Sequence, residues 1–258
     1  MTIFHAIVLG LIQGITEFLP VSSSAHLAIV QNLFGLTGPV LLVFDVVVHL
    51  GTLSALLIYF RKDLFPFPKV GMKYMGLIIA ATIPTVLIGF SIKDWMEKYF
   101  DVLWVVALTL LINSFILLST WWSPRDRDKG ECTWRDAFWV GVAQGISILP
   151  GISRSGATVS TALWLKVKSE EAVRFSFLIA IPAILGATVL LMPEMIEVFS
   201  KDMWPAMSVG FITAFISGYA AIYVLFKVTL RGQFHYFAYY TFALALLTFA
   251  FHFARLAR

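Results

Sequence analysis

Long apolar stretches dominate the chain, and most of each stretch is free of charged residues. Six of them approach or exceed the roughly 20 residues that an α-helix needs to cross the hydrocarbon core of a bilayer. Short segments rich in Lys, Arg, Asp and Glu separate several of these stretches. We therefore predict six membrane-spanning helices, at residues 40–60, 74–92, 102–122, 175–192, 205–226 and 236–254.

Two further apolar segments, at 3–36 and 137–167, are interrupted in their middle by Pro and by a cluster of hydroxyl residues. The first contains GLIQGITEFLPVSSSAH at 10–26, and the second contains GVAQGISILPGISRSGA at 141–157. The two sequences align with a one-residue gap, which pairs Gln13 with Gln144 and Ser23 with Ser153. Such paired, broken segments predict two half-helices around each break and a binding site near the bilayer midplane.

Composition agrees with a membrane protein. Hydrophobic residues make up 59% of the chain and charged residues 13%, and the mean hydropathy is +0.86. Soluble domains carry about 25% charged residues. The net charge of +4 therefore reflects basic loops, and we expect no nucleic-acid partner. The single Cys132 excludes an intramolecular disulfide, and the N-terminal residues lack the basic start of a signal peptide.

The charged loops predict how the spans are oriented. Basic residues gather in loops 61–73, 123–136 and 227–235, whereas loops 93–101 and 193–204 are balanced or acidic. Because basic loops remain on the cytoplasmic side, the first three loops are predicted to be cytoplasmic and the other two external. Arg255 and Arg258 disagree, since they would end outside.

Three spans separate the two motif copies, so the copies would enter the membrane from opposite sides. The predicted fold is an all-α integral membrane domain with an inverted-topology repeat, each half a re-entrant helix hairpin followed by three transmembrane helices. Repeat 1 covers about residues 1–122, a cytoplasmic linker covers 123–136, and repeat 2 covers 137–258. Within the spans, Gly186, Gly210 and Gly218 predict close packing between helices.

Polar residues in the broken segments are costly at membrane depth, which makes them candidates for function. Glu17 and Gln13 are four residues apart and project from one face of the first half-helix. His26 opens the half-helix after the first break, and Arg154 lies at the second break. The structural alternative is a mutual ion pair between Glu17 and Arg154 that only joins the hairpins. For His26 we favour catalysis over a structural role, because Ser23 and Glu17 are close in sequence.

Hydroxyl side chains surround both breaks, where they can satisfy backbone groups that a broken helix leaves free. They are Ser22, Ser23 and Ser24 at the first break, and Ser153, Ser155 and Thr158 at the second. We expect Ser22 and Ser155 to cap helices. Hydroxyls, an arginine and helix N-termini suit a phosphate or diphosphate, while Glu17 with Gln13 could hold Mg²⁺ or Ca²⁺.

The two motifs resemble those of the undecaprenyl-diphosphate phosphatases, the bacitracin-resistance family. Gln13 to Glu17, followed by LPVSSSAH, looks like the family's Glu/Gln-x-x-x-Glu element. Residues 150–158 look like its Pro-Gly-x-Ser-Arg-Ser-Gly-x-Thr element. The segments FDVVVHLGTLSALLIYF at 44–60 and FSFLIAIP at 175–182 are similar as well, so the likeness covers essentially the whole chain.

The resemblance implies a multi-pass enzyme of the bacterial plasma (inner) membrane that removes the terminal phosphate of undecaprenyl diphosphate, a polyprenyl diphosphate lipid. It also implies a divalent cation, Mg²⁺ or Ca²⁺, a role in cell-wall synthesis, and bacitracin resistance. The family's functional positions fall here on Glu17, Ser23, His26, Ser153 and Arg154, with Thr158 as support. We assign catalysis to Glu17, Ser23, His26 and Arg154, and phosphate binding to Ser22, Ser24, Ser153, Arg154, Ser155 and Thr158.

Two positions complicate this assignment. Position 13 is Gln, where many members of the family have Glu, which removes one carboxylate. Asp45 is a candidate replacement, although it could equally cap the span that follows it. His49 lies near Asp45 inside the same span, and we interpret it as a packed histidine with a polar partner.

The mechanism keeps several alternatives. We expect Arg154 and the half-helix N-termini to hold the diphosphate, while Glu17 holds the cation or orients His26. The attacking group is left open between His26, Ser23 and an activated water. Because the first hairpin is predicted to open outward, the site is expected to face the periplasmic or extracellular side. The oligomeric state is also left open, with a homodimer as one alternative.

A membrane transporter or flippase for a phosphorylated lipid is the alternative function, because broken inverted repeats are also a transporter architecture. The clustered Glu, His, Arg and Ser favour catalysis over transport. An acid-phosphatase-like fold is rejected, because Ser160 stands where that class has a His after its Ser-Arg element.

Overall fold

The computed structural model describes the backbone of residues 1–64, 71–99 and 102–256, and the side chains of these ranges except 93–99 and 255–256. Within them the protein is helical, and the one β-type contact is an isolated bridge between Lys129 and Val167. The basic residues Lys69 and Arg258, and the side chains of Arg255 and of loop 93–101, lie outside the described residues.

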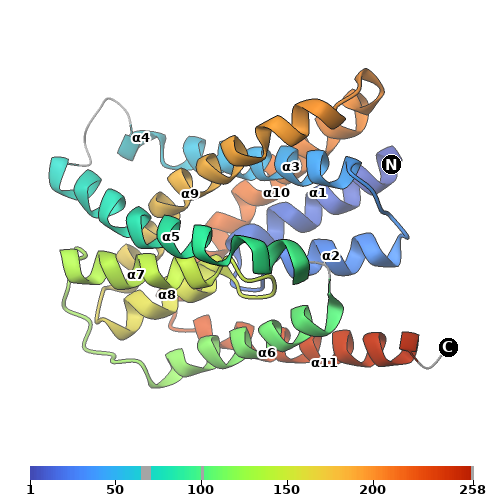
Figure 1. Ribbon diagram of the computed structural model, residues 1–258. Coiled ribbons are helices and arrows are strands. Elements are labelled where there is room, and N and C mark those ends of the chain that lie inside the picture. The colour runs from blue at the N-terminus through green and yellow to red at the C-terminus, as the bar shows by residue number, and fades with distance from the viewer. Residues whose placement is uncertain (65–70, 100–101, 257–258) are drawn as a thin grey trace.

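Both broken segments form a pair of short helices, as predicted. The first pair is α1 (Ile3–Phe18) and α2 (Ser23–Leu33), and the second is α7 (Trp134–Ile146) and α8 (Arg154–Trp164). Each pair is followed by three long helices (Figure 1). The order of elements is therefore the same in the two halves, while the inverted orientation of the halves stays a prediction.

Six helices are long and apolar enough to cross a membrane, at Val40–Tyr59, Met72–Ile92, Leu103–Trp122, Ser169–Val198, Lys201–Leu230 and Phe234–Ala254. They contain α3 (Val40–Tyr59), much of α5 (Met72–Tyr99), α6 (Leu103–Ser119), α9 (Ser169–Val198), α10 (Trp204–Leu230) and most of α11 (Phe237–Leu256). The connecting pieces are α4 (Arg61–Leu64) and the 3₁₀ turns η1 (Thr120–Trp122), η2 (Lys201–Met203) and η3 (Phe234–Tyr236). All six predicted spans are confirmed. The fourth is longer than predicted at both ends, because α9 starts at Ser169 and continues through Pro193.

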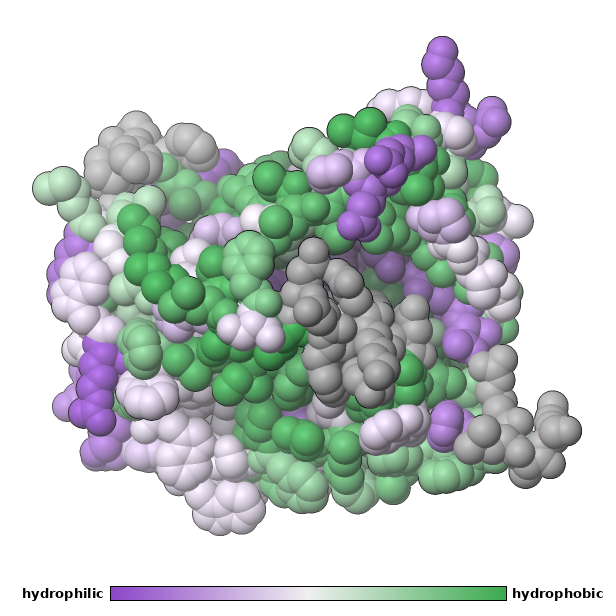
Figure 2. Space-filling model, viewed as in Figure 1, coloured by the Kyte–Doolittle hydropathy of each residue, from purple (hydrophilic) through white to green (hydrophobic). Residues whose placement is uncertain are grey.

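The surface agrees with a membrane-embedded protein. Figure 2 shows apolar residues across the middle of one face, with hydrophilic residues gathered toward the left and right ends. The helices run mainly between these ends in the same view (Figure 1). Many large apolar side chains of the spans are exposed, among them Ile83 and Phe90 of α5 and Leu247 of α11. A bilayer would cover these side chains, which water would not favour.

The three loops predicted to be cytoplasmic lie at one end of the molecule. Lys73 pairs with Glu131 at 3.2 Å, which joins loop 61–73 to loop 123–136. The His235 ring lies 4.4 Å from that of Trp121, which brings the loop before α11 to the same end. The grouping of these basic loops is thus confirmed, and which side of the membrane they face stays a prediction.

Glycines set the closest helix contacts, and the motif copies supply them. A Cβ on Gly14 of α1 would lie 2.5 Å from the Ala214 carbonyl of α10, and one on Gly141 of α7 would lie 2.1 Å from the Ala81 carbonyl of α5. Only glycine allows this approach. Gly210 and Gly218 are closely packed as predicted. The prediction for Gly186 is wrong, because a Cβ at this position would have no neighbouring atom of the described residues within 4 Å.

Candidate active site

The first break places a carboxylate beside a helix N-terminus. α1 ends at Phe18, and the chain turns through Leu19 to Ser22 before α2 starts. Glu17 is therefore in the last turn of α1. Ser22 has φ 68°, a left-handed conformation that costs energy for a residue other than glycine. Its hydroxyl accepts from the Ala25 N–H at 3.4 Å, which confirms Ser22 as the cap of α2.

At the second break a serine also caps the helix, but it is not the serine that we expected. Ser153, not Ser155, caps α8, because its hydroxyl accepts from the Gly156 N–H at 3.1 Å. The Ser155 hydroxyl instead lies 3.1 Å from that of Ser153, just as Ser24 lies 3.2 Å from Ser22. The expectation for Ser155 was wrong because α8 already starts at Arg154, which makes Ser155 the second residue of the helix and leaves Ser153 in the cap position.

The caps also correct the alignment of the two copies. Ser22 corresponds to Ser153, so the structural equivalent of Ser23 is Arg154 and not Ser153. Both residues are the first of their helices, and both donate to the carboxylate of Glu17. The two copies therefore contribute unlike side chains from like positions.

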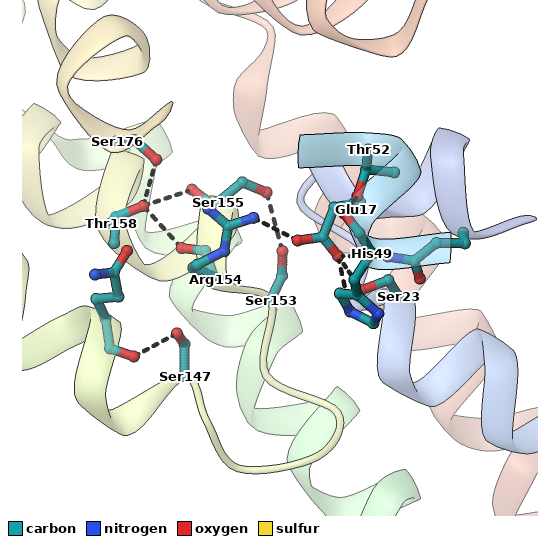
Figure 3. Close-up of polar contacts among 12 residues, drawn as sticks. Glu17, Ser23, His49, Thr52, Ser147, Ser153, Arg154, Ser155, Thr158 and Ser176 are labelled. Carbon is teal, nitrogen blue, oxygen red and sulfur yellow. Dashed lines mark hydrogen bonds and ion pairs between the residues drawn. The ribbon is translucent and has the colours of Figure 1, made fainter. Parts of the chain in front are cut away.

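The Glu17 carboxylate is where the two breaks meet (Figure 3). Arg154 Nη2 donates to Glu17 Oε1 at 2.5 Å, across 137 residues of sequence. The Ser23 hydroxyl donates to Glu17 Oε2 at 2.7 Å, and Gln13 Nε2 donates to the same oxygen at 3.1 Å. The ion pair that was the structural alternative is therefore present, and a ring of hydrogen-bond donors surrounds it.

His49 lies where His26 was expected. His49 Nε2 of α3 is 3.6 Å from Glu17 Oε2, and its Nδ1 is 2.6 Å from the Asp45 carbonyl oxygen. The described contacts of His26 are with the Ser22 carbonyl oxygen and the Tyr240 hydroxyl, each at 2.7 Å. Asp45 does not cap α3, since that helix starts five residues earlier, and its Oδ1 accepts from Gln31 at 2.8 Å.

α6 fixes the two breaks relative to each other. Asn113, which is fully buried, donates to the Pro20 carbonyl at 3.2 Å and accepts from the Ser153 N–H at 3.0 Å. The Thr109 hydroxyl, one turn earlier, donates to the Pro150 carbonyl. These backbone groups need partners because each break interrupts a helix inside the protein. Sequence reasoning missed Asn113, an isolated amide in an apolar span that a search for intramembrane polar residues could have found.

Thr158 connects the start of α8 to α9 by hydrogen bonds. Its hydroxyl donates to the Arg154 carbonyl at 2.8 Å and lies 2.5 Å from the Ser176 hydroxyl of α9 (Figure 3). Thr158 and Ser155 are fully buried. In this state, their hydroxyls hold α8 in place.

Two buried polar atoms of the site have no hydrogen-bond partner among the described residues. They are Gln13 Oε1 and Arg154 Nη1. Buried groups of this kind are rare in folded proteins, and they accept a ligand at low cost. The cationic Arg154 nitrogen suits an anion, and the Gln13 carbonyl oxygen suits a hard cation.

The described part of the chain has no group of three or more His, Cys, Asp and Glu side chains close enough to hold a metal ion. Glu17 and Gln13 Oε1 are oxygen ligands of the kind that Mg²⁺ and Ca²⁺ take, and the Gln13 amide, whose Nε2 now faces Glu17, would have to turn for both to bind one ion. Mg²⁺ commonly binds to one or two protein oxygens and completes its shell with substrate phosphates and water. The side chains at this place therefore fit such an ion when a phosphate ligand shares it.

Fold and site together define a multi-pass helical membrane protein with a buried polar site at two broken helix pairs. The chain belongs to the bacitracin resistance protein BacA family, whose sequence model matches residues 6–247.

Named relatives are similar over nearly the whole chain. The undecaprenyl-diphosphatase of Carboxydothermus hydrogenoformans is 43% identical over 95% of this chain and 96% of its own. Those of Desulfosudis oleivorans and Syntrophotalea carbinolica are 40% and 41% identical, and each match covers at least 95% of both chains.

Proposed function

We propose that this chain hydrolyses undecaprenyl diphosphate to undecaprenyl phosphate and inorganic phosphate. Membership of the BacA family and the names of its relatives support this activity. The observation that carries the proposal is the meeting of Glu17 and Arg154 from the two motif copies. It puts one carboxylate in contact with both a cationic side chain that suits phosphate and the Ser23 hydroxyl.

Phosphate recognition falls to the second break. Arg154 presents a buried Nη1 that no described residue contacts by a hydrogen bond, and a guanidinium matches the paired oxygens of a phosphate. The N-terminus of α8 starts at the same residue, and helix N-termini favour anions. Since Arg154 Nη2 already contacts Glu17, a diphosphate has to share the guanidinium with that carboxylate or replace it.

Ser23 is the attacking group that the contacts favour. Its O–H donates to Glu17 Oε2, so the carboxylate is placed to take the proton. In this step Ser23 Oγ forms a bond to the terminal phosphorus, the bond from phosphorus to the bridging oxygen breaks, and the lipid monophosphate leaves. Water then cleaves the phosphoserine and releases phosphate. Direct attack by a water that gives its proton to Glu17 is the alternative, and trapping a labelled phosphoserine distinguishes the two routes.

A divalent cation, Mg²⁺ or Ca²⁺, completes the proposal. Glu17 and Gln13 Oε1 would hold it, and the ion would neutralise charge on the diphosphate as the leaving group departs. Arg154 orients the phosphate, and the cap serines Ser22 and Ser153 lie beside the place where the diphosphate binds. His26 stays a catalytic candidate.

The proposal extends to the location and the biological role of the protein. We place the protein in the bacterial plasma membrane, with the site open to the periplasmic or extracellular side. There, removal of the terminal phosphate regenerates the carrier lipid for cell-wall synthesis. Bacitracin resistance follows if the enzyme and the antibiotic compete for the same diphosphate.

The test is phosphate release from C55 diphosphate by the purified protein in detergent with Mg²⁺ or Ca²⁺. The wild type should release phosphate only with the cation, and Arg154→Ala and Glu17→Ala should release almost none. Gly186→Ala is the matched control, because that position faces open space and should leave activity unchanged. A folded wild type that releases no phosphate with either cation contradicts the proposal, and lipid reorientation in liposomes would then support the transporter alternative.

A further inference from the structure

His26 and His49 are anchored in the same way and differ in their second partner. His26 Nδ1 lies 2.7 Å from the carbonyl oxygen of Ser22, four residues earlier, and His49 Nδ1 lies 2.6 Å from that of Asp45, also four residues earlier. A carbonyl oxygen can only accept, so Nδ1 carries the proton in both rings. The catalytically useful nitrogen of each is therefore Nε2.

The Nε2 atom of His26 is occupied by a side chain from the last helix. The Tyr240 hydroxyl lies 2.7 Å from it, and the two rings are nearly parallel, with 4° between their planes and 5.7 Å between their centroids. In a neutral imidazole with hydrogen on Nδ1, Nε2 accepts and the tyrosine O–H donates. His49 Nε2 faces the Glu17 carboxylate at 3.6 Å instead.

A packed seam between α2, α6 and α11 holds this contact in place. Ala25, Val106, Leu110 and Ala245 form a small buried cluster, with Ile29 and Leu244 packed against it. Tyr240 is one turn before Leu244 and lies on the same face of α11. His26 follows Ala25 directly on α2. The hydrogen bond between His26 and Tyr240 therefore lies next to this apolar cluster, which packs α2 against α11.

We propose that Tyr240 is a positioning residue of this site, acting through His26. Its hydroxyl and the Ser22 carbonyl hold the imidazole at both nitrogens, which fixes the tautomer and prevents the ring from turning. The inference rests on the proposed phosphatase for its kinetic consequence, whereas its chemical consequence can be measured without substrate.

The chemical consequence is that Nε2 of His26 reacts slowly with an acylating reagent. Diethyl pyrocarbonate modifies the free nitrogen of a neutral imidazole, and a hydrogen bond to that nitrogen slows the reaction. Tyr240→Phe keeps the ring and removes the hydroxyl. It should raise the modification rate of His26, read from its peptide by mass spectrometry, about tenfold, as expected for the loss of one hydrogen bond.

The structure offers two matched controls. Tyr239→Phe makes the same change one residue earlier, on a ring that is 60% exposed and whose hydroxyl has no hydrogen-bond partner among the described residues. This variant should leave the His26 rate and the phosphatase activity unchanged. His49, with its identical Nδ1 anchor, is the internal reference, and its rate should be the same in wild type and Tyr240→Phe.

The kinetic consequence separates positioning from a structural role. With C55 diphosphate, Tyr240→Phe should lower kcat about tenfold and leave KM unchanged, because the misplaced imidazole affects the reaction and not binding. Equal His26 rates in wild type, Tyr239→Phe and Tyr240→Phe overturn the proposal, even when the wild type is an active phosphatase. If Tyr240→Phe fails to fold, the wild type alone decides: a His26 rate below that of His49 supports the proposal, and a rate equal to or above it overturns it.

Discussion

Arg154 donates to Glu17 at 2.5 Å from the other copy of the motif, so one ion pair closes the contact between the two broken helix pairs. The Glu17 side chain is almost fully buried, and that of Arg154 is 15% exposed. A pair in such surroundings is sensitive to the loss of either member. The charge left behind loses this partner and has little water to solvate it.

Single substitutions should therefore cost more than the double substitution. Arg154→Met and Glu17→Gln each break the pair, and each should lower the free energy of unfolding by about 3–5 kcal/mol. The double variant buries no isolated charge and should be more stable than Arg154→Met. Thermal unfolding of the four proteins in one detergent gives the coupling. Additive losses would show that the two side chains do not interact.

Asn113 should be as important for stability as the ion pair, although it carries no charge. Asn113→Leu leaves the Pro20 carbonyl and the Ser153 N–H buried without a partner, at about 1–3 kcal/mol for each group. We expect a lower unfolding temperature and a loss of phosphate release, because both breaks shift. Ile112→Ala, at a 43% exposed position of the same helix, is the control and should change both far less. Equal effects of the two substitutions would contradict this role.

Much of the fold follows from the chain itself. The six spans and both broken pairs were predicted, because a run of about 20 apolar residues and a Pro within a short apolar segment are local signals. The predicted cap at Ser22 was right and that at Ser155 wrong. The cap lies two residues earlier, at Ser153, and a pattern of hydroxyls does not show which of them comes directly before the first helical residue.

The site was predicted only in part. Glu17 and Arg154 could be paired from the sequence, because two charges in apolar segments need each other. His49 was interpreted as a packed histidine with a polar partner, and the partner in the structure is Glu17, while the Nε2 of His26 contacts Tyr240. These partners come from α3 and α11, and sequence alone does not tell which spans pack beside a hairpin. Residues far along the chain become neighbours only through the helix packing.

Glycine substitutions test that packing directly. Gly14→Ala puts a methyl group 2.5 Å from the Ala214 carbonyl and 2.7 Å from the Gly218 nitrogen, both backbone atoms that cannot turn away. α1 must then move from α10, and we expect a loss of about 1–3 kcal/mol of stability. Gly186→Ala places the same methyl group in open space and should be neutral or stabilising. Thermal unfolding of both variants checks this, and equal stabilities would contradict the close approach.

Asp136 should make the loop end of the protein sensitive to acid. It lies in the first turn of α7, outside the six candidate spans, where it binds Lys129 at 2.9 Å. Burial alone would raise the pKa of this carboxyl. The Thr133 N–H and hydroxyl and the Lys129 ammonium outweigh burial and hold the pKa below its ordinary value of 3.8.

The sign of the effect follows from linkage. The unfolded carboxyl takes up its proton near the ordinary pKa and the folded one only at lower pH. The stabilisation is therefore complete above the ordinary value and is lost as pH falls through the lowered one. Asp136→Asn should lower the unfolding temperature at pH 7, and the difference from wild type should shrink as the pH falls below about 4. Asp126→Asn, at an exposed pair with Lys166, is the control and should change little. A constant difference across this range would contradict the assignment.

Gln13→Glu tests which residues hold the proposed cation. Gln13 Nε2 donates to Glu17, while its buried Oε1 has no partner among the described residues. A second carboxylate adds charge to the proposed ligand pair, and affinity for a divalent cation rises with ligand charge. We expect the Ca²⁺ concentration for half-maximal phosphate release to fall about tenfold. Gln13→Leu, which removes the oxygen, should raise it. Because Gln144 is the equivalent residue of the other copy and bonds to Thr85 instead, Gln144→Leu is the matched control and should leave the Ca²⁺ dependence unchanged. If all three variants show the wild-type Ca²⁺ dependence, the ion is held elsewhere and Glu17 acts only as a base.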